Sequence, residues 1–296
     1  MRILVLGSNG QLGCCLSDQL SDKNYEVFYT SRSEIDISDL AKTKASIVDL
    51  RPNIVINAAA YTAVDKAEDN HYEAEKINHH AVANIANACR DIGCWLIHLS
   101  TDYVFDGMAN HPYTEDAKTN PQGVYGASKL KGELAVQISG CQYIIIRTAW
   151  VFSEYKNNFL KTMLQMGTVH RDLDIISDQV GCPTYSQDIA KSIVLLIPKL
   201  NLNSYLSGIY HYCGNESCSW HEFAEAIFGE AKIFGWKIPN HINPVDTAKY
   251  VTRSVRPSYS VLSCSKIYST FDIVPSKWRK GIKNVLAKLK SDMFYR

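Results

Sequence analysis

The chain is 296 residues long, with 31 Lys and Arg residues against 30 Asp and Glu residues, so its formal net charge is +1. A hydrophobic content of 46% supports a large core and excludes a disordered or fibrous chain. The balanced charge predicts no nucleic-acid or membrane partner, and no apolar run reaches the roughly 20 residues that span a bilayer. The apolar start before Gly7 is too short for an export signal, so we expect a cytoplasmic protein.

The first half of the chain alternates short apolar runs with helical stretches. We expect strands at residues 2–6, 26–30, 53–57, 95–99 and 143–147, with a helix from residue 125 to about 139 before the last of them. Unbroken apolar strands that alternate with helices indicate a parallel sheet covered on both faces. The predicted fold is therefore α/β, a Rossmann-type doubly wound parallel sheet.

A glycine-rich turn follows the first strand and opens the first helix. It contains Gly7, Gly10 and Gly13. A tight turn needs the first glycine, a backbone that approaches a pyrophosphate needs the second, and close packing of the helix on the sheet favours the third. The free N–H groups of the helix N-terminus would face the phosphates. The spacing is Gly-x-x-Gly-x-x-Gly, and its position in the first βαβ unit predicts a dinucleotide site.

Residues after the second and third strands complete this predicted site. Arg32 stands where a cation can neutralise the 2′-phosphate of NADP(H), although an exposed loop arginine explains it equally well. Asp36 and Ile37 can border the adenine. The small residues up to Ala60 let a cofactor lie close to the backbone, or simply let a helix pack tightly on the sheet.

The alternation becomes less regular after about residue 150, where prolines interrupt the chain. We expect residues 1–150 to form an NAD(P)-binding Rossmann domain. Residues 151–296 should form mainly a smaller substrate-binding lobe, with some segments returning to the first domain. The cleft between the two is the expected site.

Three side chains suggest carbonyl reduction. Tyr125 and Lys129 are four residues apart, so they project from one face of the predicted helix. A neighbouring ammonium and a cationic nicotinamide would lower the pKa of the phenol, which is near 10 when free. Thr101 ends the fourth strand, where its hydroxyl can hold a substrate carbonyl against Tyr125. A Tyr-x-x-x-Lys pair alone is more often a surface pair; the three together favour an active site.

No metal site is predicted. The nine cysteines include no Cys-x-x-Cys pair, and their odd number favours reduced thiols. His211, Cys213, Cys218 and His221 are the nearest approach to a metal cluster, but their spacing fits no zinc pattern.

The chain resembles the extended short-chain dehydrogenases/reductases. The resemblance rests on the glycine turn at 7–13, the segment 57–68, the string Ser-Thr-Asp-Tyr-Val-Phe-Asp-Gly at 100–107, Tyr-Gly-Ala-Ser-Lys at 125–129, and the segments 147–151, 178–184, 219–224 and 256–257. These pieces run in order over nearly the whole chain. It is most similar to the members that reduce a ketone on a nucleotide-linked sugar.

The resemblance implies a reaction and a set of roles. The reaction would reduce the C4 ketone of dTDP-4-dehydro-β-L-rhamnose to dTDP-L-rhamnose, a precursor of surface polysaccharide, with NADPH or NADH as the hydride donor. Tyr125 would donate the proton, Lys129 would activate it and hold the cofactor, and Thr101 would orient the carbonyl. Asp102 and Trp150 would contact the sugar. The cofactor would be lined by Gly10, Gln11, Leu12, Asp36, Ile37, Ala60, Tyr61 and Thr62.

Some features separate the chain from its relatives. Certain members carry a glutamate two residues after the third glycine and use it in a Mg²⁺-bridged dimer; here that position is Cys15, a poor ligand for a hard cation, so a homodimer is possible but a Mg²⁺ bridge is not expected. Sugar dehydratases carry Thr-Asp-Glu where this chain has Tyr103, which disfavours dehydration. An epimerase, another keto-sugar reductase, or an NADP-binding regulatory subunit similar to the methionine adenosyltransferase beta subunit remains an alternative.

Overall fold

The computed structural model describes residues 1–200, 204–250 and 252–294. Its centre is a six-stranded sheet with the order β10-β5-β4-β3-β1-β2. Every pairing in this sheet is parallel. The strands are β1 (Arg2–Leu6), β2 (Glu26–Thr30), β3 (Ile54–Asn57), β4 (Trp95–Thr101), β5 (Gln142–Thr148) and β10 (Gly208–His211). The expected doubly wound α/β fold is confirmed.

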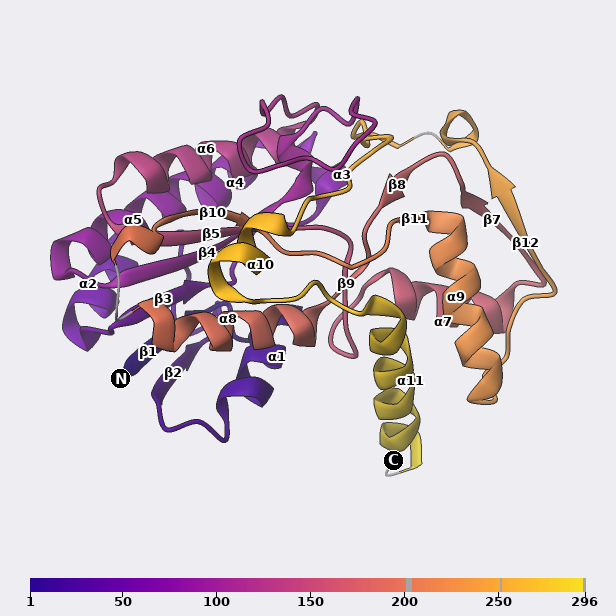
Figure 1. Ribbon diagram of the computed structural model, residues 1–296, viewed down its shortest axis with the longest axis horizontal. Helices are drawn as coiled ribbons and strands as arrows, with labels where there is room; N and C mark the ends of the chain where they lie inside the picture. The colour runs from indigo at the N-terminus through magenta and orange to yellow at the C-terminus, as the bar shows by residue number, and fades with distance from the viewer. Residues whose placement is uncertain (201–203, 251, 295–296) are drawn as a thin grey trace.

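Helices cover both faces of this sheet (Figure 1). The side chains of β1 alternate between two separate cores, because successive residues of a strand point to opposite faces. Ile3 and Val5 pack with α1 (Gln11–Leu20) and α8 (Ser186–Leu200). Leu4 and Leu6 pack on the other face. That face is covered by α2 (Leu40–Leu50), α5 (Ala81–Ile92) and α6 (Val124–Ile138).

A short helical region joins β3 to α5. It consists of α3 (Val64–Ala67), α4 (His71–Glu75) and a π-helical turn, η1 (Lys76–His80). Short 3₁₀ turns lie at Asp102–Val104, Ser204–Leu206 and Thr247–Lys249.

A second lobe, on the right in Figure 1, has its own hydrophobic core. Its helices are α7 (Phe159–Val169), α9 (Trp220–Ile233) and α11 (Trp278–Phe294), and its strands form three short pairs: β6 (Val151–Phe152) with β9 (Thr184–Tyr185), β7 (Asp172–Ile176) with β12 (His241–Val245), and β8 (Val180–Gly181) with β11 (Cys218–Ser219). Ser219 and Glu222 form a reciprocal capping box that begins α9.

Two segments beyond residue 150 return to the central sheet. β10 pairs with the outer edge of β5, and α8 packs against α1. A further helix, α10 (Ser265–Phe271), packs against β10 through Phe271 and Tyr210. A domain boundary at residue 150 stays a prediction.

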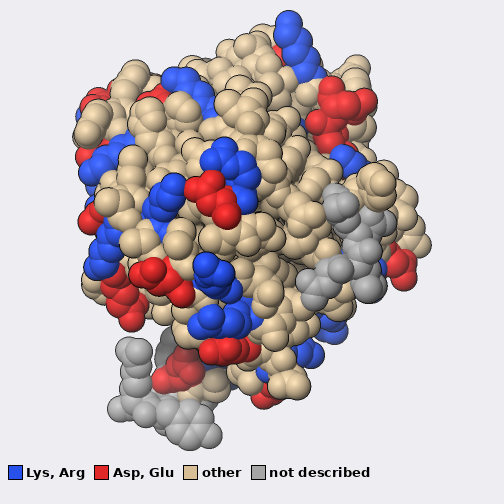
Figure 2. Space-filling model, turned by 90° about the vertical axis from the view of Figure 1, so that its left-hand side faces the viewer, with Lys and Arg blue, Asp and Glu red and all other residues tan. Residues whose placement is uncertain are grey.

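Across the residues described, no helix combines the length and the apolar character needed to cross a membrane. Figure 2 shows one face of the molecule, on which cationic and anionic side chains are interspersed rather than gathered by sign.

Candidate active site

A cavity of about 350 Å³ opens above the carboxyl ends of the central strands. Parallel α/β sheets bind ligands at this edge. The cavity brings together residues from the glycine turn, from the ends of β3, β4 and β5, from α6 and from the segment after β6. Its lining includes Gly10, Gln11, Leu12, Ala60, Thr62, Ser100, Tyr125, Lys129, Thr148, Lys156 and Asn157. Seven of these eleven are residues that the sequence predicts for the site.

A second cavity of about 220 Å³ adjoins the first and shares Gly10, Ala58 and Ala60 with it. Its lining holds one further glycine of the turn and the three residues expected around the adenosine. These are Gly7, Arg32, Asp36 and Ile37. The Nε atom of Arg32 lies 3.1 Å from Oδ2 of Asp36, and the arginine side chain is 76% exposed. The exposed guanidinium therefore lies at the cavity lining, paired with Asp36.

The glycine turn is as crowded as a dinucleotide turn requires. Gly7 has a φ of +79°, and a Cβ placed on it would lie 2.8 Å from the backbone nitrogen of Ala59. A Cβ on Gly13 would lie 2.4 Å from the carbonyl oxygen of Gly7. Gly7 thus makes the turn, and Gly13 lets α1 pack against it. Gly13 and Tyr61 do not line either cavity; the backbone N–H of Tyr61 instead donates to Oδ1 of Asn78.

Tyr125 and Lys129 lie on one face of α6 and both reach the larger cavity. The Lys129 side chain is buried, and its ammonium donates a 2.5 Å hydrogen bond to the carbonyl oxygen of Leu99. Burial lowers the pKa of this ammonium to about 8, while the nearby Glu133 carboxylate raises it. The Lys129 ammonium is thus bonded to the sheet, while the side chain lines the cavity.

The Lys129 ammonium bonds Leu99 and not the Tyr125 hydroxyl, so the activation of Tyr125 by Lys129 stays a prediction. Burial raises the pKa of Tyr125, and hydrogen bonding with Thr101 opposes that rise. The Lys129 ammonium does not lower it, since its hydrogen bond goes to Leu99. The phenol is therefore protonated, which is the state a proton donor needs at the start of a reduction.

Thr101 stands between Tyr125 and a buried carboxyl group. Its hydroxyl donates to Oδ1 of Asp102 at 3.0 Å and accepts from the backbone N–H of Tyr103 at 3.2 Å. Asp102 is 2% exposed, and burial raises its pKa to about 6. Neither Thr101 nor Asp102 lines either cavity; Thr101 lies next to cavity residues Ser100 and Tyr125, and its role in holding a substrate carbonyl stays a prediction.

Trp150 also lies outside both cavities. Its ring stacks on Trp220, with centroids 3.5 Å apart and planes 6° from parallel. A Cβ on Gly181 would lie 2.4 Å from Cε2 of Trp150, so the indole also fills the space over β8. Trp150 has a φ of +46°, in the left-handed region that large residues rarely adopt. Its predicted contact with a sugar stays a prediction.

A buried ion pair supports the cavity from behind. Nη2 of Arg147 lies 2.7 Å from Oε2 of Glu133, and both side chains are almost fully buried. Ser100 donates a hydrogen bond to Oε1 of the same carboxylate. Because Glu133 lies on α6 and its partners end β4 and β5, this pair fixes the helix that carries Tyr125 against the strand that carries Thr101.

Sequence reasoning missed Ser100, Thr148, Lys156 and Asn157 as cavity residues. Ser100 and Thr148 end the two strands that flank the predicted site, so strand-end position could have identified them. Nothing in the sequence marks Lys156 and Asn157, because a loop far along the chain carries them here.

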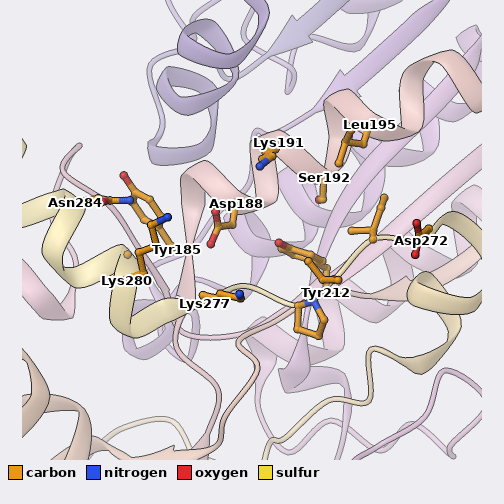
Figure 3. Close-up of a pocket in the computed structure, with 14 residues that line it drawn as sticks. Tyr185, Asp188, Lys191, Ser192, Leu195, Tyr212, Asp272, Lys277, Lys280 and Asn284 are labelled. Carbon is orange, nitrogen blue, oxygen red and sulfur yellow. The ribbon is translucent and has the colours of Figure 1, made fainter.

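A separate cavity of about 480 Å³ lies between α8 and the start of α11 (Figure 3). Its lining includes Tyr185, Asp188, Lys191, Tyr212, Lys277 and Lys280. It contains none of the residues predicted for hydride transfer, so it is not the reaction site.

One group of potential metal ligands occurs among the described residues: Glu75, His79 and His80. The Glu75 carboxylate already contacts His79 and the ammonium of Lys131. The four residues considered from the sequence form no such group; His211 and Cys213 instead bond Tyr113, Arg147 and Cys264 within the core.

Comparisons with known proteins agree with this geometry. The family model of the RmlD substrate binding domain matches residues 1–291. A dTDP-4-dehydrorhamnose reductase of Aggregatibacter actinomycetemcomitans is 40% identical over 291 residues, covering 97% of this chain and 98% of the relative.

Two crystal structures share the whole architecture. A dTDP-4-dehydrorhamnose reductase of Clostridium acetobutylicum superposes with a TM-score of 0.91 at 37% identity, covering 98% of this chain and 100% of that one. A Bacillus anthracis dTDP-4-dehydrorhamnose reductase in complex with NADP gives 0.88 at 35% identity, covering 97% and 99%.

Proposed function

We propose that this chain, which belongs to the RmlD substrate binding domain family, reduces the C4 ketone of dTDP-4-dehydro-β-L-rhamnose to dTDP-L-rhamnose. The observation that carries the proposal is the single cavity in which the glycine turn, Tyr125 and Lys129 meet. The full-length match to relatives named for this reaction supplies the substrate class.

NADPH is the cofactor that the site fits, with NADH as an alternative. The nicotinamide supplies a hydride to the ketone carbon when it is bound. The glycine turn and the adjoining cavity provide room for the pyrophosphate and adenosine, and Arg32 stands at the rim where a 2′-phosphate would project. The Bacillus anthracis relative was solved with NADP bound.

Tyr125 is the proton donor in this proposal. As hydride reaches C4 of the sugar, negative charge develops on the ketone oxygen, and the Tyr125 hydroxyl transfers its proton to that oxygen. To hold the same oxygen, the Thr101 hydroxyl turns its single proton away from Oδ1 of Asp102 and donates it to the ketone oxygen. The cation of Lys129 would then stabilise the phenolate that remains, and its ammonium would hold the nicotinamide ribose.

The sugar contacts of Asp102 and Trp150 belong to the same proposal. Trp150 lies at the junction of β5 and β6, and its ring stacks on Trp220. We expect this aromatic pair to contact the sugar.

The first experiment follows nicotinamide absorbance. Purified protein is mixed with NADPH and with enzymatically generated dTDP-4-dehydro-L-rhamnose. Loss of absorbance with formation of dTDP-rhamnose, absent in Tyr125→Phe, is the expected result. Clear NADPH binding without oxidation of NADPH would contradict the proposed substrate and turn attention first to another keto-sugar, then to a regulatory subunit.

Assembly and location are part of the proposal as well. We expect a cytoplasmic enzyme, which is consistent with nine free thiols. For a homodimer, a Mg²⁺ bridge through residue 15 does not fit, because Cys15 is fully buried and burial raises the pKa of its thiol to about 12. Sedimentation with and without EDTA tests this: a dimer should be unaffected by the chelator.

A further inference from the structure

The loop that follows β6 reaches across the molecule to the glycine turn. The Gln11 side chain, in the first turn of α1, accepts two hydrogen bonds from this loop: one from the Ser153 hydroxyl at 2.8 Å and one from Nδ2 of Asn158 at 3.0 Å. Ser153 is fully buried, so the attachment is part of the packed structure. Residues 153–158 are therefore held beside the turn expected to bind the cofactor phosphates.

This attachment places the cationic side chain of Lys156 beside the glycine turn. It lines the cavity of about 350 Å³ together with Gly10, Gln11 and Lys129. Lys156 forms no ion pair with any residue in the described part of the chain. Its φ of +53° places its backbone in the left-handed region, which residues other than glycine rarely adopt.

The ammonium also acts on the first turn of α1. Burial raises the pKa of the Cys14 thiol, and the Lys156 ammonium opposes that rise. The positive charge thus lies within electrostatic range of the helix N-terminus. This is where free N–H groups attract an anion, and a cation beside them strengthens that attraction.

We propose that Lys156, on the loop that follows β6, binds the pyrophosphate of the dinucleotide at the glycine turn. This inference rests on the proposed function, since it needs a dinucleotide in the cavity. The glycine turn carries no cationic side chain, and the Lys129 ammonium bonds Leu99, so among the residues that line this cavity Lys156 is the one whose ammonium has no ion pair and no hydrogen bond to any described residue. A hydrogen bond to a charged phosphate oxygen is stronger than one between neutral groups.

A Lys156 that binds the pyrophosphate should affect NADPH and NADH equally. The pyrophosphate is common to NADPH and NADH, whereas the 2′-phosphate occurs only in NADPH. Removal of the Lys156 charge should therefore weaken both cofactors by the same factor, while a change at Arg32 should weaken NADPH more.

The experiment measures the dissociation constants of NADPH and NADH by nicotinamide fluorescence, with no sugar present. Lys156→Ala should raise both constants about tenfold, the usual size of a charge-assisted contact. Lys156→Arg, which keeps the charge and has the same backbone requirement, should stay within about threefold of the original protein on the same scale. Thermal melting of both variants without cofactor should match the unchanged protein.

A matched control is Lys23→Ala, which removes a lysine from the turn after α1, at the far end of that helix. It should leave both constants unchanged. Equal binding by Lys156→Ala and the original protein would overturn the inference, as would a loss confined to NADPH. Failure of the original protein to bind either cofactor would instead refute the proposed function, so the two failures are distinguishable.

Discussion

The Lys129 ammonium donates a hydrogen bond to the carbonyl oxygen of Leu99, at the carboxyl end of β4. One helical turn further along α6, the Glu133 carboxylate bonds Ser100 and Arg147 on the two adjacent strands. The helix that carries Tyr125 is therefore bonded to the sheet at two points, one helical turn apart. The Lys129 ammonium bonds the strand and not Tyr125.

Tyr125→Phe should lose most of the turnover while keeping cofactor binding, because only the proton donor is removed. The ring of the phenylalanine fills the same space in the cavity. Stopped-flow oxidation of NADPH with the keto-sugar measures the first effect, and nicotinamide fluorescence measures the second. Near-normal turnover in this variant would remove Tyr125 from the mechanism.

Arg32→Glu should weaken NADPH more than NADH. The substitution replaces a cation with an anion at the place where the 2′-phosphate would project, and it adds repulsion to the loss of attraction. The ratio of the two dissociation constants is the measurement. An equal effect on both cofactors would show that Arg32 is only the exposed partner of Asp36.

Glu133→Gln should destabilise the protein by about 3–5 kcal/mol, because it leaves the buried Arg147 guanidinium without its counter-charge. Denaturation by urea measures the free energy of unfolding. Glu225→Gln is the matched control: Glu225 pairs with His221 at 3.5 Å but is 56% exposed, so its change should stay within about 0.5 kcal/mol. Similar losses in the free energy of unfolding for both variants would show that burial does not make the Glu133–Arg147 pair more important for stability.

Lys129→Met should be inactive yet more stable than the original protein near neutral pH. The pKa of Lys129 falls from 10.5 to about 8 on burial, so the unfolded state binds more protons between those values and stability rises with pH across that window. Below pH 8 the charged lysine carries its full burial cost, on the order of 1–3 kcal/mol. The gain from methionine should therefore be largest below pH 8 and shrink toward pH 10.5. Denaturation at pH 6.5 and pH 10 tests this; a pH-independent difference would contradict it.

Much of the fold could be predicted because its signals are local. The apolar runs that predict β1 to β5 are unbroken, and each is separated from the next by a helical stretch. The glycine turn and the Tyr125–Lys129 spacing are also short-range patterns, and the structure brings them into one cavity. The prediction missed β10, whose four residues depend on β5 for their pairing.

The surroundings of several side chains could not be predicted, because they depend on contacts between distant segments. Trp150 is positioned by Trp220, seventy residues later, and its left-handed backbone leaves no pattern in the sequence. Lys156 reaches the glycine turn only because Gln11 bonds the loop that carries it. Helical spacing places Lys129 on the same face of α6 as Tyr125 without specifying which oxygen its ammonium bonds, and that oxygen is the Leu99 carbonyl.

The position of β10 at the edge of the central sheet has a consequence for synthesis on the ribosome. β5 is complete at residue 148, but its outer edge stays unpaired until residues 208–211 have emerged. An unpaired strand edge is a template for pairing with other chains. The nascent protein must therefore pass through a stage in which the sheet is nearly built but open on one side, and folding of the sheet waits for a segment more than fifty residues away.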